Sequence, residues 1–291
     1  MRSNRLVAAL VAVVSLSASV AGVGLIAAGQ AGTQGGALPL EPTRDRGSSV
    51  APAFEGWFPN SDGTFTLLVG YFNRNLRQTL DIPVGPNNRI EPGGPDMGQP
   101  TFFEARRQWG VFTIKVPRDF GTKKLTWTIT ANGETNAIPL GLTKSYEVEP
   151  YRESGMGNTP PTVTFVKGGP VLTGPPMGIA RTLTGSVNQP VTLTFWGDDK
   201  RGPLEETAGR GRGANLPPFT VSLHKFRGPG DISFKPERPQ ANRETGEVTA
   251  EAIFSAPGEY IVRVQLNDAS GEGGAGFQCC WTNAHVKVAI K

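Results

Sequence analysis

The chain has 291 residues, enough for about two domains, and its 37% hydrophobic content with 15 Phe, 5 Trp and 4 Tyr suffices for packed cores. Gly (38) and Pro (25) exceed a fifth of the residues, which predicts many turns rather than a disordered low-complexity chain. The formal charge of +4 falls to +2 without Arg2 and Arg5, and no basic stripe with interleaved aromatics occurs, so nucleic acid is excluded as an expected partner.

The N-terminus resembles an export signal. Two arginines among the first residues precede the apolar run Leu6–Val14, and small residues at 19–21 suit signal peptidase. We therefore expect a signal peptide over residues 1–21, and a periplasmic, cell-surface or secreted protein. The alternative is an uncleaved anchor, since Leu6–Ala28 is long enough to span a bilayer, although its later half is weakly apolar. Membrane contact is expected only through this segment, if it is uncleaved.

Residues 22–53 are rich in Gly, Ala and Pro without periodicity, which predicts a flexible lead-in. An antiparallel β-sandwich is predicted over 54–150. Asn132-Gly133 suits a type I′ hairpin because both of its central residues take φ > 0. Four runs are typical of strands: Thr64–Phe72, Val111–Val116, Leu125–Thr130 and the return strand Thr135–Leu140.

Pro and Gly are too dense in Pro83–Pro100 for a regular central strand, so this segment is either a long ordered loop or a pair of short edge strands. No long amphipathic helix occurs after the signal segment. Residues 151–160 break every pattern and are interpreted as a linker.

Residues 161–291 predict a second β-sandwich, because short strands separated by turn residues occur without a helix. Apolar and polar residues alternate in Val191–Phe195, Val248–Phe254, Tyr260–Leu266 and Ala284–Ile290. The predicted fold class is therefore all-β, with two tandem antiparallel sandwiches.

The second domain resembles PKD-type domains, which have an immunoglobulin-like fold. The similarity lies in Asn158–Val163, Phe226–Phe234 and, most specifically, Phe254–Asp268. Pro257-Gly258 forms a corner, and Tyr260 resembles the tyrosine that ties a sandwich corner to the backbone. The resemblance implies an extracellular bacterial spacer or interaction module and no activity.

Two features depart from the family. Leu223 stands where the family often has a core Trp, and Asp198–Pro218 is a long insertion, interpreted as a surface loop. The first domain faintly resembles β modules of uncharacterised secreted bacterial proteins, at Ile82–Asn88 and Asp96–Thr101. That similarity implies no function.

No catalytic residue or cofactor is expected. Only two histidines occur: His285 is predicted on the outward face of the last strand, and His224 lies in the strand-like run Val221–Phe226. A lone strand histidine is usually structural or solvated. No Gly-x-Ser-x-Gly elbow accompanies either of them.

Cys279-Cys280 is the unusual pair. Exported proteins usually oxidise their thiols, which favours a structural vicinal disulfide. The alternatives are a reduced pair or intermolecular link, and a metal or redox site. The metal interpretation lacks ligands, because His285 lies about 20 Å away along a strand at ~3.3 Å per residue.

Asn267 and Asp268, at a strand end before a Gly-rich stretch, are weak calcium candidates, and no other metal ligand is proposed. Ordinary turn chemistry is the favoured interpretation of these two residues. Aromatic side chains are a second possible ligand platform. Trp196 falls on the outward parity of its strand, whereas no face is assigned to Trp57, Trp109 or Trp281.

Three functions follow from these observations. The leading hypothesis is an exported, non-enzymatic β-sandwich protein acting as an interaction, adhesion or envelope-associated structural module, with an unknown protein or glycan of the cell envelope as partner. The first alternative is a carbohydrate- or calcium-binding module of an extracellular system. The second is a secreted enzyme or redox protein that uses Cys279 and Cys280.

Overall fold

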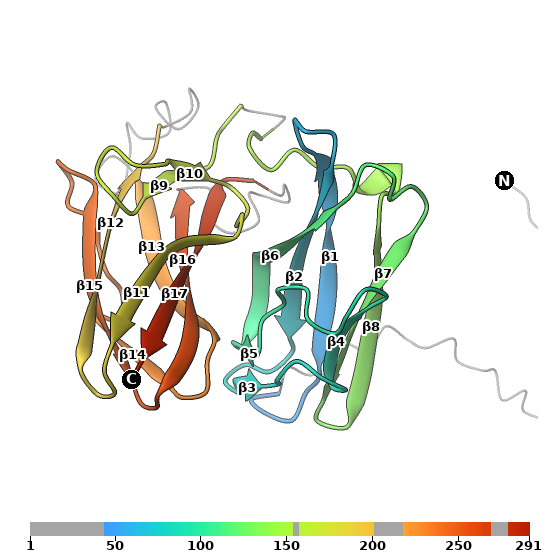
Figure 1. Cartoon of the computed structure of the whole chain (residues 1–291), viewed down its shortest axis with the longest axis horizontal. Helices are drawn as coiled ribbons and strands as arrows, with labels where there is room; N and C mark the ends of the chain where they lie inside the picture. Colours follow the sequence, from blue (N-terminus) through green and yellow to red (C-terminus); the bar gives the residue numbers. More distant parts are fainter. Residues whose placement is uncertain (1–43, 154–156, 201–217, 269–278) are drawn as a thin grey trace, which may run out of the picture. The chain divides into compact units, whose positions relative to one another are not determined.

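The computed structural model describes residues 44–153, 157–200, 218–268 and 279–291, whose regular structure is almost entirely β-strand (Figure 1). The helical element within these ranges is a 3-10 turn, η1 (Lys144–Tyr146). No helix in the described ranges is long and apolar enough to cross a membrane. The predicted signal peptide, 1–21, lies outside them.

Strands β1 to β8 form the first sandwich. Two three-stranded antiparallel sheets, ordered β1-β2-β6 and β4-β7-β8, share one hydrophobic core, and a short pair β3-β5 lies beside them. Trp127, Phe103 and Phe112 are the largest fully buried side chains of that core. The strands are β1 (Val50–Pro59), β2 (Phe65–Asn73), β3 (Leu80–Asp81), β4 (Asn88–Glu91), β5 (Phe102–Phe103), β6 (Arg106–Val116), β7 (Lys124–Ala131) and β8 (Glu134–Gly141).

The predicted type I′ hairpin is confirmed. Ala131 pairs with Glu134, and the two residues between them, Asn132 and Gly133, have φ of 50° and 80°. Positive φ at both central positions gives the turn a twist that matches the flanking strands.

Two expectations for the first sandwich change. The lead-in was predicted to run to residue 53, but β1 begins at Val50, which pairs with Asn73 and is fully buried. The segment Pro83–Pro100 holds one strand, β4, which pairs with β7 at the edge of its sheet, rather than two. Composition alone missed the start of β1 because its small and Pro residues carry little β-propensity.

Strands β9 to β17 form the second sandwich. They are β9 (Thr162–Thr164), β10 (Leu172–Thr173), β11 (Ile179–Gly185), β12 (Pro190–Asp198), β13 (Phe219–Arg227), β14 (Ile232–Lys235), β15 (Glu247–Phe254), β16 (Gly258–Asp268) and β17 (Trp281–Ile290). One sheet has the order β10-β9-β12-β15-β14 and the other β11-β17-β16-β13. All pairs are antiparallel except β11 with β17.

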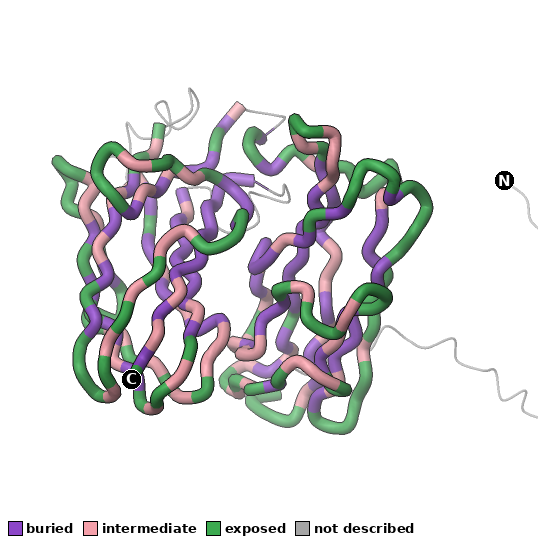
Figure 2. The backbone as a smooth tube through the Cα atoms, in the orientation of Figure 1, coloured by how far each residue is buried: buried purple, intermediate pink, exposed green. Residues whose placement is uncertain are grey.

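This topology is that of an immunoglobulin-like sandwich. Naming β9 and β12 to β17 as A to G gives the sheets ABED and CFG, the division found in constant-type immunoglobulin domains. Tyr260, near the start of β16, donates its hydroxyl hydrogen to the Ala256 carbonyl at 2.7 Å, which forms the predicted tyrosine corner. The all-β fold class is therefore confirmed, with each sandwich burying its strand interiors and exposing its turns (Figure 2).

The predicted linker, 151–160, is partly packed. Glu153 and Asn158 are buried, and the Glu153 amide donates to the Asn158 carbonyl at 2.7 Å. Residues 154–156, most of the Asp198–Pro218 insertion and the Gly-rich stretch after Asp268 lie outside the described ranges. The division into two domains at this linker stays a prediction.

Candidate functional site

The two sandwiches meet along a polar contact surface, here called the seam. It comprises Glu55, Arg107, Gln108, Gly110 and Val111 from the first sandwich and Arg263, Trp281, Asn283 and His285 from the second. Both sandwiches belong to one compact unit. Most of these residues lie on β6 and β17, with Glu55 on β1 and Arg263 on β16, and the seam covers the free edge of β6.

β6 ends its sheet, so one of its edges has no strand neighbour. The carbonyls of Trp109 and Gly110 accept hydrogen bonds from Asn283 Nδ2 at 3.3 and 3.0 Å, and the Val111 carbonyl accepts one from His285 Nε2 at 3.0 Å. Side chains of β17 that point away from their own core thus satisfy main-chain acceptors that would otherwise be buried without partners.

His285 lies on the outward face of its strand as predicted, but it is not solvated, because β6 covers it and leaves 7% exposed. Burial, and secondarily the positive charge of Arg263, lower the pKa of His285 to about 3. The ring is therefore neutral at ordinary pH. Because a carbonyl only accepts, the proton resides on Nε2.

Gly110 allows Trp281 to enter the seam. Gly110 has φ of +51°, and a Cβ built on it would lie 1.9 Å from the Trp281 ring. Trp281 is 1% exposed. Only glycine satisfies both the left-handed backbone and this close approach.

A β-bulge brings a carboxylate beneath the same strand. The register of β1 shifts between Phe54 and Gly56, which leaves Glu55 as the extra residue. Its buried carboxylate accepts hydrogen bonds from Arg107 Nη2 and from the Gly110 amide, both at 2.7 Å. The charge of Glu55 is therefore paired with Arg107 and with a main-chain donor, and these bonds offset the desolvation cost of burying a carboxylate.

The predicted cysteine pair lies directly before β17. Cys279 and Cys280 are joined by a disulfide and are 1% and 0% exposed. Cys280 has φ of +79°, and its carbonyl accepts the Asp268 amide at 3.2 Å. The described residues contain no free cysteine. The pair therefore belongs to the packed junction between the linker and the last strand.

The side-chain oxygens of both calcium candidates are buried. Asp268 is 3% exposed and accepts a hydrogen bond from the Asn158 side chain, while the Asn267 side-chain oxygen is buried. Within the described ranges, no three His, Cys, Asp or Glu side chains are grouped to hold a metal ion. Asp268 thus ties the linker to β16, which agrees with a structural role.

The aromatic candidates divide between core and surface. Trp57 is buried and donates to the Thr143 carbonyl at 2.8 Å. Trp196 lies outward as predicted and is half-buried, with Lys167 Nζ at 5.2 Å from its ring centroid. Trp109 is half-buried beneath the Arg107 guanidinium, 3.9 Å from the ring centroid. No row of exposed rings forms among these residues.

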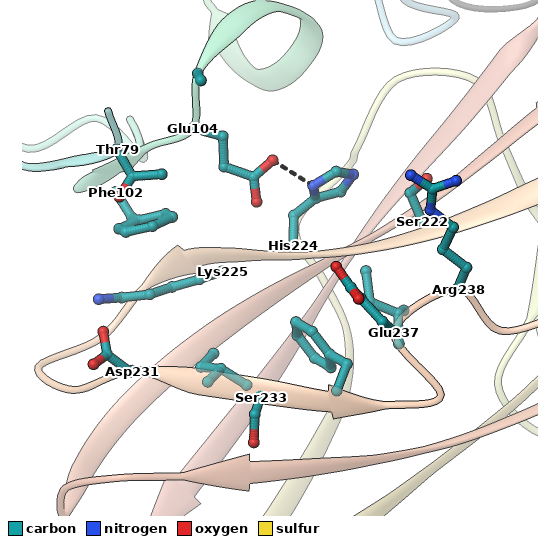
Figure 3. A pocket seen from close by; sticks show the side chains of 14 residues that line it. Thr79, Phe102, Glu104, Ser222, His224, Lys225, Asp231, Ser233, Glu237 and Arg238 are labelled. Atoms are coloured by element: carbon teal, nitrogen blue, oxygen red, sulfur yellow. Dashed lines mark hydrogen bonds and ion pairs between the residues drawn. The ribbon is translucent and has the colours of Figure 1, made fainter. Parts of the chain in front are cut away.

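A groove of about 850 Å³ opens beside the seam (Figure 3). Thr79, Phe102 and Glu104 line it from the first sandwich, and residues of β13 and β14 line it from the second. His224, the second histidine, faces this groove, and its Nδ1 lies 2.7 Å from Glu104 Oε2. This pair crosses from one sandwich to the other.

Charges in the groove are partly paired. Burial alone would raise the pKa of Glu104, but the hydrogen bond from His224, together with the charges of His224 and Arg263, lowers that pKa below its ordinary value. Lys225 is buried, with Nζ 2.9 Å from Asp81 and 4.6 Å from the Phe102 ring centroid. These two pairs hold the groove's inner wall together.

Sequence reasoning identified both histidines and the cysteines but missed Glu55 and Gly110. The available signal was Gly110 inside an apolar strand, since glycine there often marks a bulge or a close approach. Glu55 gave no signal, because its position depends on a bulge that forms against another strand.

No protein-family model and no curated protein matches the chain. Among solved structures, it is similar to domains 4 and 5 of the S-layer protein SbsC (11% identity, 84% of this chain and 98% of that chain, TM-score 0.22) and to the D0-D1 domain of intimin (10%, 83% and 98%, TM-score 0.24). Fibronectin(III)-like modules of Clostridium thermocellum CbhA are also similar (14%, 84% and 94%, TM-score 0.22). These TM-scores are low, so the fold assignment rests on the strand topology itself: two β-sandwiches, the second of them immunoglobulin-like.

Proposed function

We propose that the chain is an exported, non-enzymatic protein that acts as an interaction, adhesion or structural module of the cell envelope. The observation that carries this proposal is the seam. Arg263, Asn283 and His285 of the second sandwich bond the Gln108 side chain and the carbonyls of residues 109–111 of the first, which suits a protein that holds two modules in a fixed relation. Its partner is a protein or glycan of the envelope.

The chemistry of the candidate residues supports a structural reading. His285 is neutral and its proton is committed to the Val111 carbonyl. The disulfide of Cys279 and Cys280 is buried. The PKD-like segment Phe254–Asp268 resembles spacer and interaction modules of extracellular proteins. The signal-like N-terminus supports export.

Expression of the full chain in a bacterial host tests this proposal. Fractionation and N-terminal sequencing of the product should give an envelope or medium protein that begins after Ala21. The purified protein should cosediment with isolated envelope fractions and show no turnover across hydrolase and thiol–disulfide substrate panels. Turnover that disappears in a His224→Ala or Glu104→Gln variant would contradict the proposal.

A further inference from the structure

One edge of the second sandwich is open. β13 ends the sheet β11-β17-β16-β13, and β14 ends the other sheet, so both strands have an edge without a strand neighbour. The groove lies where these two edges face each other (Figure 3). In variable-type immunoglobulin domains an additional strand pairs beside the strand that corresponds to β13. Here the described chain places no full strand at that position.

The direction of the main-chain groups on β13 follows from the pairing of β16. The Asp268 amide donates to the Cys280 carbonyl, so Asp268 turns its main chain toward the last strand. Because main-chain groups alternate along a strand, Asn267 turns toward β13, where it is paired with Thr220. Thr220 therefore bonds inward to β16.

The same alternation directs Ser222 and His224 inward and leaves Val221 and Leu223 facing the free edge. Each of these two residues has one N–H and one C=O. Among the described residues, no main-chain hydrogen bond outside the strand ladders reaches either of them. Their side chains remain in the core at 7% and 8% exposure.

At the C-terminal end of β13, residues of the first sandwich already form hydrogen bonds with this edge. The Thr101 amide donates to the Phe226 carbonyl at 3.1 Å, and Arg227 Nε donates to the Gln99 carbonyl at 2.7 Å. An extended segment therefore docks where β13 leaves its regular pairing with β16. The open stretch at Val221 and Leu223 continues directly from this established interface.

The exposed charged side chains of the groove, Asp231, Glu237 and Arg238, are here called the rim, and they favour a basic occupant. Glu104 and Lys225 are paired, whereas Asp231, Glu237 and Arg238 line the groove with exposed side chains and make no ion pair among the described residues. Two carboxylates against one guanidinium leave the rim net negative.

We propose that the free edge of β13 at Val221 and Leu223 binds an extended, basic peptide segment of a partner protein by strand addition. This rests on the proposed function as an interaction module and names its contact surface. Main-chain hydrogen bonds to the edge provide affinity, and the acidic rim selects a basic side chain on the partner.

The probe is a labelled peptide of about nine residues, the length of an ordinary strand, with valine and threonine alternating and lysine at both ends and the centre. Fluorescence anisotropy with the full chain should show saturable binding. Amide exchange at Val221 and Leu223 should slow by about tenfold or more when the peptide is bound, a change of the size that one hydrogen bond produces. Absence of binding up to about 1 mM, or protection elsewhere, would overturn the proposal.

Two charge-reversal variants make the test specific. Asp231→Lys with Glu237→Lys changes only exposed rim side chains and should weaken binding by about tenfold. Glu134→Lys with Glu244→Lys, equally exposed and outside the groove, should leave binding unchanged. Equal binding by both variants would overturn the basic-peptide proposal. The Asp231→Lys/Glu237→Lys variant should also be tested for cosedimentation with envelope fractions. If it cosediments like the wild type, the envelope function stands but the β13 edge is not the contact surface.

Discussion

The edges of β6 and β13 present the same physical problem with opposite outcomes. Each strand ends a sheet and leaves main-chain groups without a strand partner. At β6, side chains of Asn283 and His285 satisfy the carbonyls and Trp281 covers the backbone. At β13, the main-chain groups of Val221 and Leu223 face the free edge, and Leu223 lines the groove. Side-chain donors thus satisfy the main-chain carbonyls of the β6 edge. The main-chain groups of the β13 edge have no such partners and stay available for pairing with an added strand.

The largest expected effect is at Gly110. Gly110→Ala places a Cβ against Trp281 and strains a left-handed backbone, so it should lower the free energy of unfolding by roughly 3 kcal/mol or more. Chemical denaturation measures this change. Gly133→Ala is the matched control, because its φ is also positive but no atom lies within 4 Å of the added Cβ.

The control should lose only about 1 kcal/mol, the typical penalty for a non-glycine residue with φ > 0. Combining Gly110→Ala with Trp281→Ala should recover part of the loss, with a coupling energy of about 1 kcal/mol or more. Equal destabilisation of the two glycine variants would show that Trp281 does not seal the β6 edge.

Removing a donor from the sealed edge should have a smaller effect. His285→Leu leaves the Val111 carbonyl buried without a partner, at a cost of about 1–3 kcal/mol in the free energy of unfolding. Asn283→Leu should behave similarly through the Gly110 carbonyl. Stability equal to wild type in both variants would contradict the assignment of these side chains as edge caps.

Acid should weaken the seam in a defined direction. The pKa of His285 is about 3 in the folded state, against an ordinary value of 6.5. Between these two pH values the imidazole binds a proton in the unfolded state but not in the folded state. The free energy of unfolding should then fall with decreasing pH by up to about 1.4 kcal/mol per pH unit from this residue. Because the pKa of Glu104 is also lowered, the free energy of unfolding should fall further at still lower pH.

His285→Gln isolates this contribution because glutamine retains a side-chain donor but does not titrate. Between about pH 6 and 5, above the ordinary range of carboxylates, the variant should show a flatter decline than wild type. Denaturant midpoints at each pH provide the measurement. Parallel curves would mean that His285 is not buried as a neutral ring.

The smallest effect concerns the disulfide. With both sulfurs buried, native protein treated with a mild dithiol and a thiol reagent should remain unlabelled, whereas denatured and reduced protein should react at Cys279 and Cys280. Mass spectrometry distinguishes the two states. Rapid labelling of native protein would favour the redox alternative over a structural pair.

Local pattern predicted much of the fold, because strand alternation and turn residues act over a few positions. Asn132-Gly133 and Tyr260 are examples in which the residue itself requires the geometry. Local pattern could not predict the contacts of the seam. Glu55 and Gly110 acquire their roles from bulges and from Trp281, far away in the chain, and the outward parity of His285 predicted its face but not the strand that buries it.

Amide hydrogen exchange of the free protein tests the central comparison most directly. Val221 and Leu223 should exchange fast, while their inward-bonded neighbours Ser222 and His224, and Gly110 with its amide on Glu55, should exchange slowly. Slow exchange at Val221 and Leu223 equal to that of their neighbours would contradict an open β13 edge.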